Sequence, residues 1–210
     1  VISDALREKL TPGATIHEVK KRTTKKLFGN DKMSRIFAIA DTPKPKGLEM
    51  LKDIKKDIVV LEELGISGNI GNIIRTSLAL DVGGMVLLNM DPLDLYDRRL
   101  IRASRGYMFK LPIMTASTKE FLDHCKTNNE TLLVTVMDGE KSVQEIASIP
   151  ERLLIVFGGE KQGVSPDVEG AANLRVRIPI SERVESLNVS AAAGITLFNR
   201  MKFNRSLQEE

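Results

Sequence analysis

Cysteine and histidine are scarce in this chain of 210 residues, which holds one cysteine, Cys125, and two histidines, His17 and His124. A single thiol excludes an internal disulfide, and neither a Cys₂His₂ nor a Cys₄ zinc site can be assembled from these residues. Aromatic residues make up 4% of the chain and tryptophan is absent, which argues against a sandwich or a stacking platform built on aromatic anchors. We therefore expect chemistry that needs no metal ion.

Long apolar runs and a secretory signal are lacking as well. The uninterrupted apolar segments are far shorter than the ~18 residues of a membrane-spanning helix, and no signal-peptide pattern is present. We expect a cytoplasmic protein that has no membrane partner. The first residue is Val1 rather than methionine, so we also expect that the beginning of a small N-terminal domain is missing.

The net positive charge of the chain lies in its N-terminal part. Residues 1–48 hold 11 Lys and Arg against 5 Asp and Glu, a net charge of +6, whereas residues 49–210 hold 20 against 23, a net charge of −3. Such a cluster is either a solvated helix face or a surface that contacts nucleic-acid phosphates. The candidate RNA-binding cations are Lys20, Lys21, Arg22, Lys25 and Lys26.

Two prolines and a glycine in residues 43–47 mark a linker between two domains. Residues 1–47, with a short basic helix that Gly29-Asn30 would stop and a strand over 35–40, are expected to be the end of a small domain. Residues 48–210 are expected to form the second domain.

Short apolar runs alternate with helical segments in the second domain. The runs are apolar at consecutive positions, which is typical of parallel strands buried on both faces, and the alternation predicts an α/β fold. Ligands of such sheets bind at the carboxyl ends of the strands. The predicted strands cover 58–61, 85–88, 132–136, 153–157 and 176–180, and the predicted helices cover 70–81, 97–106, 118–128, 142–148 and 187–203.

Three motifs follow predicted strands. In the first, Gly68 and Gly71 frame a tight entry into a helix that carries Arg75 one turn later. An arginine there is either an ordinary surface residue or a fork of donors that grips a phosphate or polarises a hydroxyl. No G-x-G-x-x-G fingerprint and no P-loop are present, which disfavours a nucleotide-dependent oxidoreductase.

In the second motif, a buried strand runs directly into Gly158-Gly159-Glu160. Glycines at a strand end allow a ligand to approach the backbone, although a plain β-turn with an exposed acid has the same pattern. In the third motif, a strand ends near Pro179 and a polar loop leads to Ser186-Leu187-Asn188. Either Ser186 or Asn188 would cap the following helix, whose small residues permit close packing.

In this order and at these spacings, the three motifs resemble the SpoU/TrmH branch of the SPOUT superfamily, the RNA ribose 2′-O-methyltransferases. The resemblance covers about residues 57–205. Within that branch, Asp97-Arg-Arg-Leu-Ile-Arg-Ala-Ser-Arg-Gly-Tyr-Met-Phe109 looks like the thiostrepton/nosiheptide-resistance 23S rRNA methyltransferases. Lys26-Leu-Phe-Gly, Phe37-Ala-Ile-Ala and Pro43-Lys-Pro resemble the end of the N-terminal RNA-binding domain of these enzymes.

The resemblance implies an α/β domain with a mostly parallel sheet and a deep trefoil knot over 48–210, preceded by the remnant of a small α/β RNA-binding domain. True knots are rare, and general topology rules would not predict one. The loops of the knot would bind S-adenosylmethionine. The implied cofactor-binding residues are Arg75, Arg105, Thr135, Gly158, Gly159, Ile178 and Leu187.

Arg75 matches the catalytic arginine of the family, which helps to activate the ribose 2′-hydroxyl. An arginine side chain offers donors and no acceptor, so a role in electrostatics and positioning is preferred to that of a general base. The other implied catalytic residues are Asn69, Glu160, Ser186 and Asn188.

The resemblance further implies a homodimer in which the helix from Leu187 to Phe203 packs against its copy, and an adenosine of 23S rRNA in the thiopeptide-binding loop as the target. Motif two departs from the resistance enzymes, which carry serine where this chain has Gly159. A tRNA or other rRNA ribose methyltransferase of the same branch is the nearest alternative. An RNA-binding assembly factor without catalytic activity is the alternative from another functional class.

Overall fold

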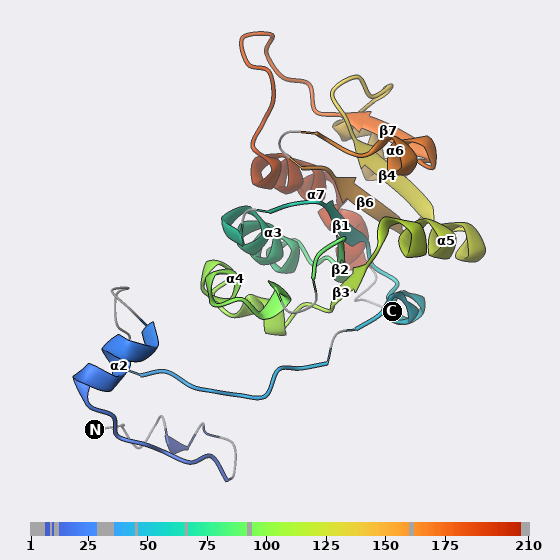
Figure 1. Ribbon diagram of the computed structural model, residues 1–210. Coiled ribbons are helices and arrows are strands. Elements are labelled where there is room, and N and C mark those ends of the chain that lie inside the picture. The colour runs from blue at the N-terminus through green and yellow to red at the C-terminus, as the bar shows by residue number, and fades with distance from the viewer. Residues whose placement is uncertain are drawn as a thin grey trace. The chain divides into compact units, whose positions relative to one another are not determined.

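The computed structural model of the chain (Figure 1) describes residues 7–8, 10, 13–28, 36–44, 46–65, 67–91, 94–159 and 162–206. Contacts within the chain divide it into two units, Val1–Asp41 and Thr42–Glu210, and each is described by itself. The division of the chain that the linker indicates, at 47/48, stays a prediction.

The N-terminal unit contains a basic helix, α2 (Lys21–Phe28), with Lys20 immediately before it. All five cations selected from the sequence have exposed side chains. The stop expected at Gly29-Asn30 lies outside the described residues. Exposure leaves these charges available to a polyanion, as a nucleic-acid contact requires.

The prediction of a strand over 35–40 is wrong for residues 36–40, which are the part of this segment that the structure describes. Residues 36–40 form no strand, and Ile36 and Ile39 are 55% and 90% exposed. A strand gains its stability from hydrogen bonds and side-chain packing with a neighbouring strand. The described residues of this unit provide no such neighbour, so the apolar pattern is not enough.

The linker is tied to the edge of the sheet. Lys46 forms a parallel bridge with Met114, and the Lys46 carbonyl accepts a hydrogen bond of 3.3 Å from the Thr115 amide. A short 3₁₀ helix, η1 (Leu48–Asp53), follows and buries Leu51. The start of the second unit is therefore anchored by both hydrogen bonds and apolar packing.

Seven parallel strands form one sheet in the order β3-β2-β1-β6-β4-β7-β5. The α/β class with a parallel sheet is thus confirmed, and four of the five predicted strands coincide with β1, β2, β4 and β6. The fifth is displaced toward the N-terminus, because Pro179 has no amide to donate to a ladder. The strands are β1 (Ile58–Glu62), β2 (Gly84–Leu88), β3 (Ile113–Ala116), β4 (Thr131–Thr135), β5 (Lys141–Ser142), β6 (Leu153–Phe157) and β7 (Leu174–Arg177).

Helices cover both faces of the sheet. In Figure 1, α3, α4 and α7 lie on one side and α5 and α6 on the other. The helix predicted over 142–148 is a 3₁₀ helix, and the one predicted over 97–106 ends early and is followed by a 3₁₀ turn. Among the described residues, no helix is long and apolar enough to cross a membrane. The helices are α3 (Ser67–Ala79), α4 (Arg98–Ala103), α5 (Thr118–Asn128), α6 (Pro166–Gly170) and α7 (Val189–Ser206), and the further 3₁₀ helices are η2 (Asp94–Tyr96), η3 (Tyr107–Phe109) and η4 (Val143–Ser148).

The two faces of the sheet pack into two separate apolar cores. In β1, Val59 and Leu61 pack into the cluster that includes α3 and α7, whereas Ile58 and Val60 pack into the cluster that includes α5 and α6. Successive side chains of a strand point to opposite faces, so a strand that is apolar throughout serves both cores. The carboxyl ends of these strands are consequently held rigidly at one edge.

A buried ionic network attaches α7 to the start of β1. The Arg200 guanidinium donates to both carboxylate oxygens of Asp57 at 2.9 and 3.0 Å, and both side chains are fully buried. Asn204 donates to the same carboxylate at 3.1 Å, and Arg200 also donates to the backbone carbonyls of Ile146, Ile149 and Glu151. Asp57 also accepts a bond from the Leu153 amide at the start of β6.

Candidate active site

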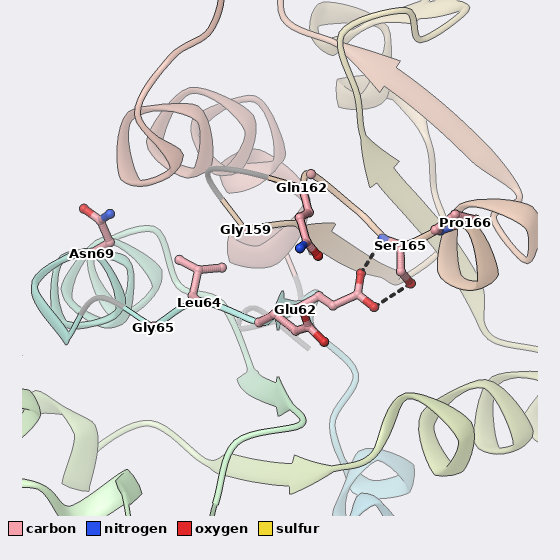
Figure 2. A pocket seen from close by; sticks show the side chains of 10 residues that line it. Glu62, Leu64, Gly65, Asn69, Gly159, Gln162, Ser165 and Pro166 are labelled. Carbon is pink, nitrogen blue, oxygen red and sulfur yellow. Dashed lines mark hydrogen bonds between the residues drawn. The ribbon is translucent and has the colours of Figure 1, made fainter.

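The carboxyl ends of β1 and β6 lie side by side, with Leu61 paired to Phe157. Beyond them is a pocket of about 360 Å³. Figure 2 shows its walls, which come from the end of β1, the start of α3 and the loop after β6. Ten residues line it: Glu62, Glu63, Leu64, Gly65, Asn69, Gly159, Gln162, Gly163, Ser165 and Pro166.

Glu62 ties the end of β1 to the loop after β6. Its side chain is 3% exposed and accepts hydrogen bonds from the Ser165 hydroxyl at 2.6 Å and from the Ser165 amide at 2.8 Å, which Figure 2 draws as dashed lines. Two donors compensate a buried carboxylate for the loss of water. Sequence reasoning did not select Glu62, although an acid that ends an apolar strand is a usable signal.

The loop from Gly158 to Ser165 folds back on itself. Gly159 and Gly163 form an antiparallel bridge, with the Gly163 amide 2.9 Å from the Gly159 carbonyl oxygen. A Cβ at Gly158 would lie 2.0 Å from the Gly163 carbonyl carbon, so any side chain there would displace the backbone. Glu160 lies outside the described residues, but Gly159 and Gln162 on either side of it line the pocket.

Helix α3 carries the residues of the first motif. Asn69 lines the pocket, and its side-chain oxygen accepts a hydrogen bond of 3.3 Å from the Asn188 amide group. Arg75 is half-buried on the same helix and is not among the residues that line the pocket. The structure thus brings Asn69, Asn188 and Gly159 to one edge of the sheet.

Gly71 sets the distance between α3 and the segment that carries Arg105. A Cβ at Gly71 would lie 2.5 Å from the Ala103 Cβ and 2.7 Å from the Ser104 amide nitrogen. Arg105 follows, exposed and with φ of +52°, a left-handed conformation that is uncommon for a residue other than glycine. The close contact between α3 and the end of α4 therefore depends on the absence of a side chain at position 71.

The third motif forms a long loop between β7 and α7, which projects away from the sheet in Figure 1. Ser186 is exposed, and Asn188 caps α7 because its side-chain oxygen accepts a hydrogen bond of 2.9 Å from the Ser190 amide. Ile178 packs against the edge of one core, and Leu187 is half-buried. Of the two expected capping residues, Asn188 is the one that caps.

Thr135 ends β4 and turns toward the neighbouring strand, where its hydroxyl donates to the Val156 carbonyl at 2.9 Å. The residues that line the pocket do not include Thr135, Ile178, Leu187 or Arg105. Of the expected cofactor-binding residues, Gly159 lines this pocket, and the role of the set stays a prediction. Within the part of the chain that the structure describes, no cluster of His, Cys, Asp and Glu could hold a metal ion.

A second cavity of about 490 Å³ lies beyond the ends of β1 and β2. Its polar lining is mostly acidic, with Glu63, Asp91, Asp94 and Asp97 beside Arg99. The Asp97 carboxylate accepts a hydrogen bond of 2.6 Å from the Arg99 amide and thereby caps α4. Part of this acidic lining is thus already used to hold α4 in place.

Two family models match successive parts of the chain. The model of the SpoU rRNA methylase family matches residues 56–198, and the model of the thiostrepton-resistance methylase N terminus matches residues 2–54. These matches confirm the resemblance carried by the three motifs.

Two curated relatives are named 23S rRNA (adenosine(1067)-2′-O)-methyltransferase. The protein from Streptomyces azureus is 40% identical over 178 residues, which are 85% of this chain and 66% of that protein. The protein from Streptomyces laurentii is 39% identical over 194 residues, which are 92% of this chain and 72% of that protein. The chain thus spans about two thirds of the length of these relatives.

Solved structures share the fold. The AdoMet-bound rRNA methyltransferase from Sinorhizobium meliloti is 26% identical, with a TM-score of 0.69 over 76% of this chain and 61% of that chain. The SpoU methyltransferase AviRb from Streptomyces viridochromogenes, in complex with AdoMet, is 26% identical, with a TM-score of 0.66 over 73% of this chain and 59% of that chain. The chain belongs to the SpoU rRNA methylase family.

Proposed function

We propose that this chain transfers a methyl group from S-adenosylmethionine to the ribose 2′-hydroxyl of an adenosine in the thiopeptide-binding loop of 23S rRNA. The observation that carries the proposal is that two family models match successive parts of the chain, the SpoU rRNA methylase family over 56–198 and the thiostrepton-resistance N terminus over 2–54. Relatives about 40% identical carry the corresponding name.

The pocket fits a cofactor of this kind. Gly65, Gly159 and Gly163 bring no side chain to its lining, so a ligand can approach backbone amides and carbonyls. Such groups can recognise an adenine without charged side chains. Bound S-adenosylmethionine would supply an electrophilic methyl group on a sulfonium.

The residues of α3 would act on the ribose. A guanidinium has donors and no acceptor, so Arg75 would not take the hydroxyl proton but would stabilise the developing oxyanion and hold a neighbouring RNA phosphate. The Asn69–Asn188 hydrogen bond would orient the start of α3 relative to α7. Glu160 and Ser186 remain candidates for contacts with the ribose.

The homodimer and the knot are parts of the same proposal. On α7, Ala191, Ile195 and Phe198 recur at helical spacing, and Ile195 and Phe198 are 40% and 64% exposed, which provides an apolar face for a second copy. β4 separates β7 from the neighbouring strands β6 and β1, so the chain that follows β7 must pass over the carboxyl ends of the strands to bring Asn188 to Asn69 at the start of α3. A knot requires a path of this kind. An experimental structure in which residues 178–188 pass through no loop would overturn the knot.

The function is tested with labelled S-adenosylmethionine and deproteinised 23S rRNA, followed by mapping of alkali-resistant linkages. We expect label at one adenosine of the thiopeptide-binding loop and none in an RNA whose target nucleotide lacks the 2′-hydroxyl. Tight cofactor binding without labelled rRNA would contradict the proposal.

The role of Arg75 is tested in the same assay. Arg75→Ala should slow methyl transfer by about a hundredfold or more, the loss that follows removal of one preorganised donor. The exposed Lys126→Ala on α5 is the matched control and should retain full activity. Activity of Arg75→Ala close to that of the unmodified chain would show that this assignment is wrong.

A further inference from the structure

Residues 98–110 form a strongly basic surface segment of the second unit, Thr42–Glu210, which holds the candidate active site and is called the catalytic unit below. They hold five cations and no Asp or Glu. All five cationic residues are exposed: Arg98, Arg99, Arg102, Arg105 and Lys110. The catalytic part of the chain is slightly acidic as a whole, so this concentration of positive charge is local.

Two exposed aromatic rings lie within the same segment. Tyr107 and Phe109 are 42% and 58% exposed in a chain that has only 4% aromatic residues. Phe109 stacks on Tyr96 with ring centroids 6.4 Å apart and an interplanar angle of 13°. The Lys110 ammonium lies 5.6 Å from the centroid of the Tyr107 ring.

The exposure of these rings follows from the way the segment is anchored. Met108, between them, is buried in the core, as are Leu100 and Leu111 on either side. Burial of these three apolar side chains fixes the segment and leaves its aromatic neighbours in solvent. Tyr96 supports the Phe109 ring from one side, and Tyr107 lies in the same 3₁₀ helix, η3.

The segment also lies against the helix that carries the candidate catalytic residues. Ala103 and Ser104 contact α3 at Gly71, at a separation that leaves no room for a Cβ. Asn69 and Arg75 lie on the same helix, on either side of Gly71. A nucleic acid bound to this segment would thus be held at a constant position relative to α3.

We propose that this basic–aromatic surface, formed by Arg98, Arg102, Tyr107, Phe109 and Lys110, binds unpaired nucleotides of the substrate RNA. The proposal rests on the proposed function. Unpaired bases expose the planar faces that stack on aromatic rings, and the flanking cations pair with phosphates. In a duplex the same faces are covered by neighbouring bases, so this surface should bind a single-stranded RNA loop more tightly than a duplex.

The test is RNA binding by the full chain, with the hairpin that carries the thiopeptide-binding loop and a fully paired duplex of the same sequence as probes. Phe109→Leu should weaken binding of the hairpin about tenfold and leave binding of the duplex unchanged, and Phe109→Trp should retain hairpin affinity. Arg102→Ala and Lys110→Ala should each lower the salt dependence of binding by about 0.7 in log–log slope. Lys126→Ala, on α5, is the control for loss of a cation elsewhere.

Equal hairpin affinity of Phe109→Leu and the unmodified chain would overturn the proposal, as would an equal loss with hairpin and duplex. Methyl transfer is followed in the same samples. Hairpin binding without methyl transfer by the unmodified chain would contradict the proposed function, while the Phe109 variants still decide whether the surface binds unpaired RNA.

Discussion

Glu62 illustrates how one residue shapes the candidate site. It ends β1, its carboxylate is buried, and its two hydrogen-bond donors both belong to Ser165. The loop after β6, of which Gly158, Gly159 and Gly163 are described, is therefore held to the strand beside it. We infer that Glu62 positions this loop and does not itself contact the reacting atoms.

Glu62→Gln tests this inference with almost no change of shape. The amide provides one acceptor oxygen instead of two and places an NH₂ group against a Ser165 donor, so unfolding should become easier by about 1–3 kcal/mol. Methyl transfer should fall while Asp123→Asn, an exposed control on α5, has no effect. Denaturant unfolding and the rRNA assay measure the two effects, and unchanged values in both would refute the role.

Cys125 lies on the buried face of α5, and burial raises the pKa of its thiol to about 12, with Glu130 adding to the increase. The thiolate is the reactive form, so the folded chain should hold far less of it than an exposed thiol would. Alkylation by iodoacetamide at mildly alkaline pH should be very slow in the folded chain and fast in denaturing urea. Equal rates in both states would contradict the burial of this thiol.

At the scale of elements, α7 connects the site to the opposite edge of the sheet. Its first residues lie next to Asn69 through the Asn188 cap, and its later turns carry Arg200 into the core against Asp57. A buried ion pair of this kind fixes the angle and register of a helix that has little amphipathic character of its own. Its loss should therefore weaken the whole catalytic unit.

Arg200→Met removes the partner of a fully buried carboxylate. We expect a loss of about 3–5 kcal/mol in the free energy of unfolding, because Asp57 would remain buried without its cation. Arg200→Met combined with Asp57→Asn should lose less than the sum of the two single variants. Urea unfolding of the four chains measures the coupling, and strictly additive losses would show that the pair is not coupled.

Strand prediction succeeded where apolar residues are consecutive and failed where they are few. The runs that became β1, β2, β4 and β6 are apolar at almost every position, so burial on both faces leaves little alternative. β3 is only four residues long, and the two residues of β5 form a strand because β7 lies beside them. Neighbours that are distant in sequence decide such short strands.

At the scale of the whole molecule, the apolar face of α7 is the strongest indication of a second copy. Ile195 and Phe198 are exposed although α7 is otherwise packed against α3 and η4. An apolar face that stays exposed on an otherwise buried helix is expected where another subunit covers that face.

Phe198→Glu should convert a dimer into a monomer, because a carboxylate buried in an apolar interface has no partner. Sedimentation velocity at several protein concentrations measures the change. Met137→Glu, at a residue that is 58% exposed elsewhere on the unit, is the control and should leave the dimer intact. A monomeric unmodified chain, or a dimeric Phe198→Glu variant, would remove α7 from the interface.

The sequence by itself determined the α/β class, the central strands, the basic N-terminal segment and the family, because consecutive apolar runs and closely spaced motifs are local properties of a chain. Only the tertiary structure decided that Glu62 holds Ser165, that Gly71 must lack a side chain, that Asn188 joins Asn69, and that Arg200 lies fully buried against Asp57. Each of these contacts joins residues at least 32 positions apart. Their partners are set by strand order and helix packing, which no local pattern records.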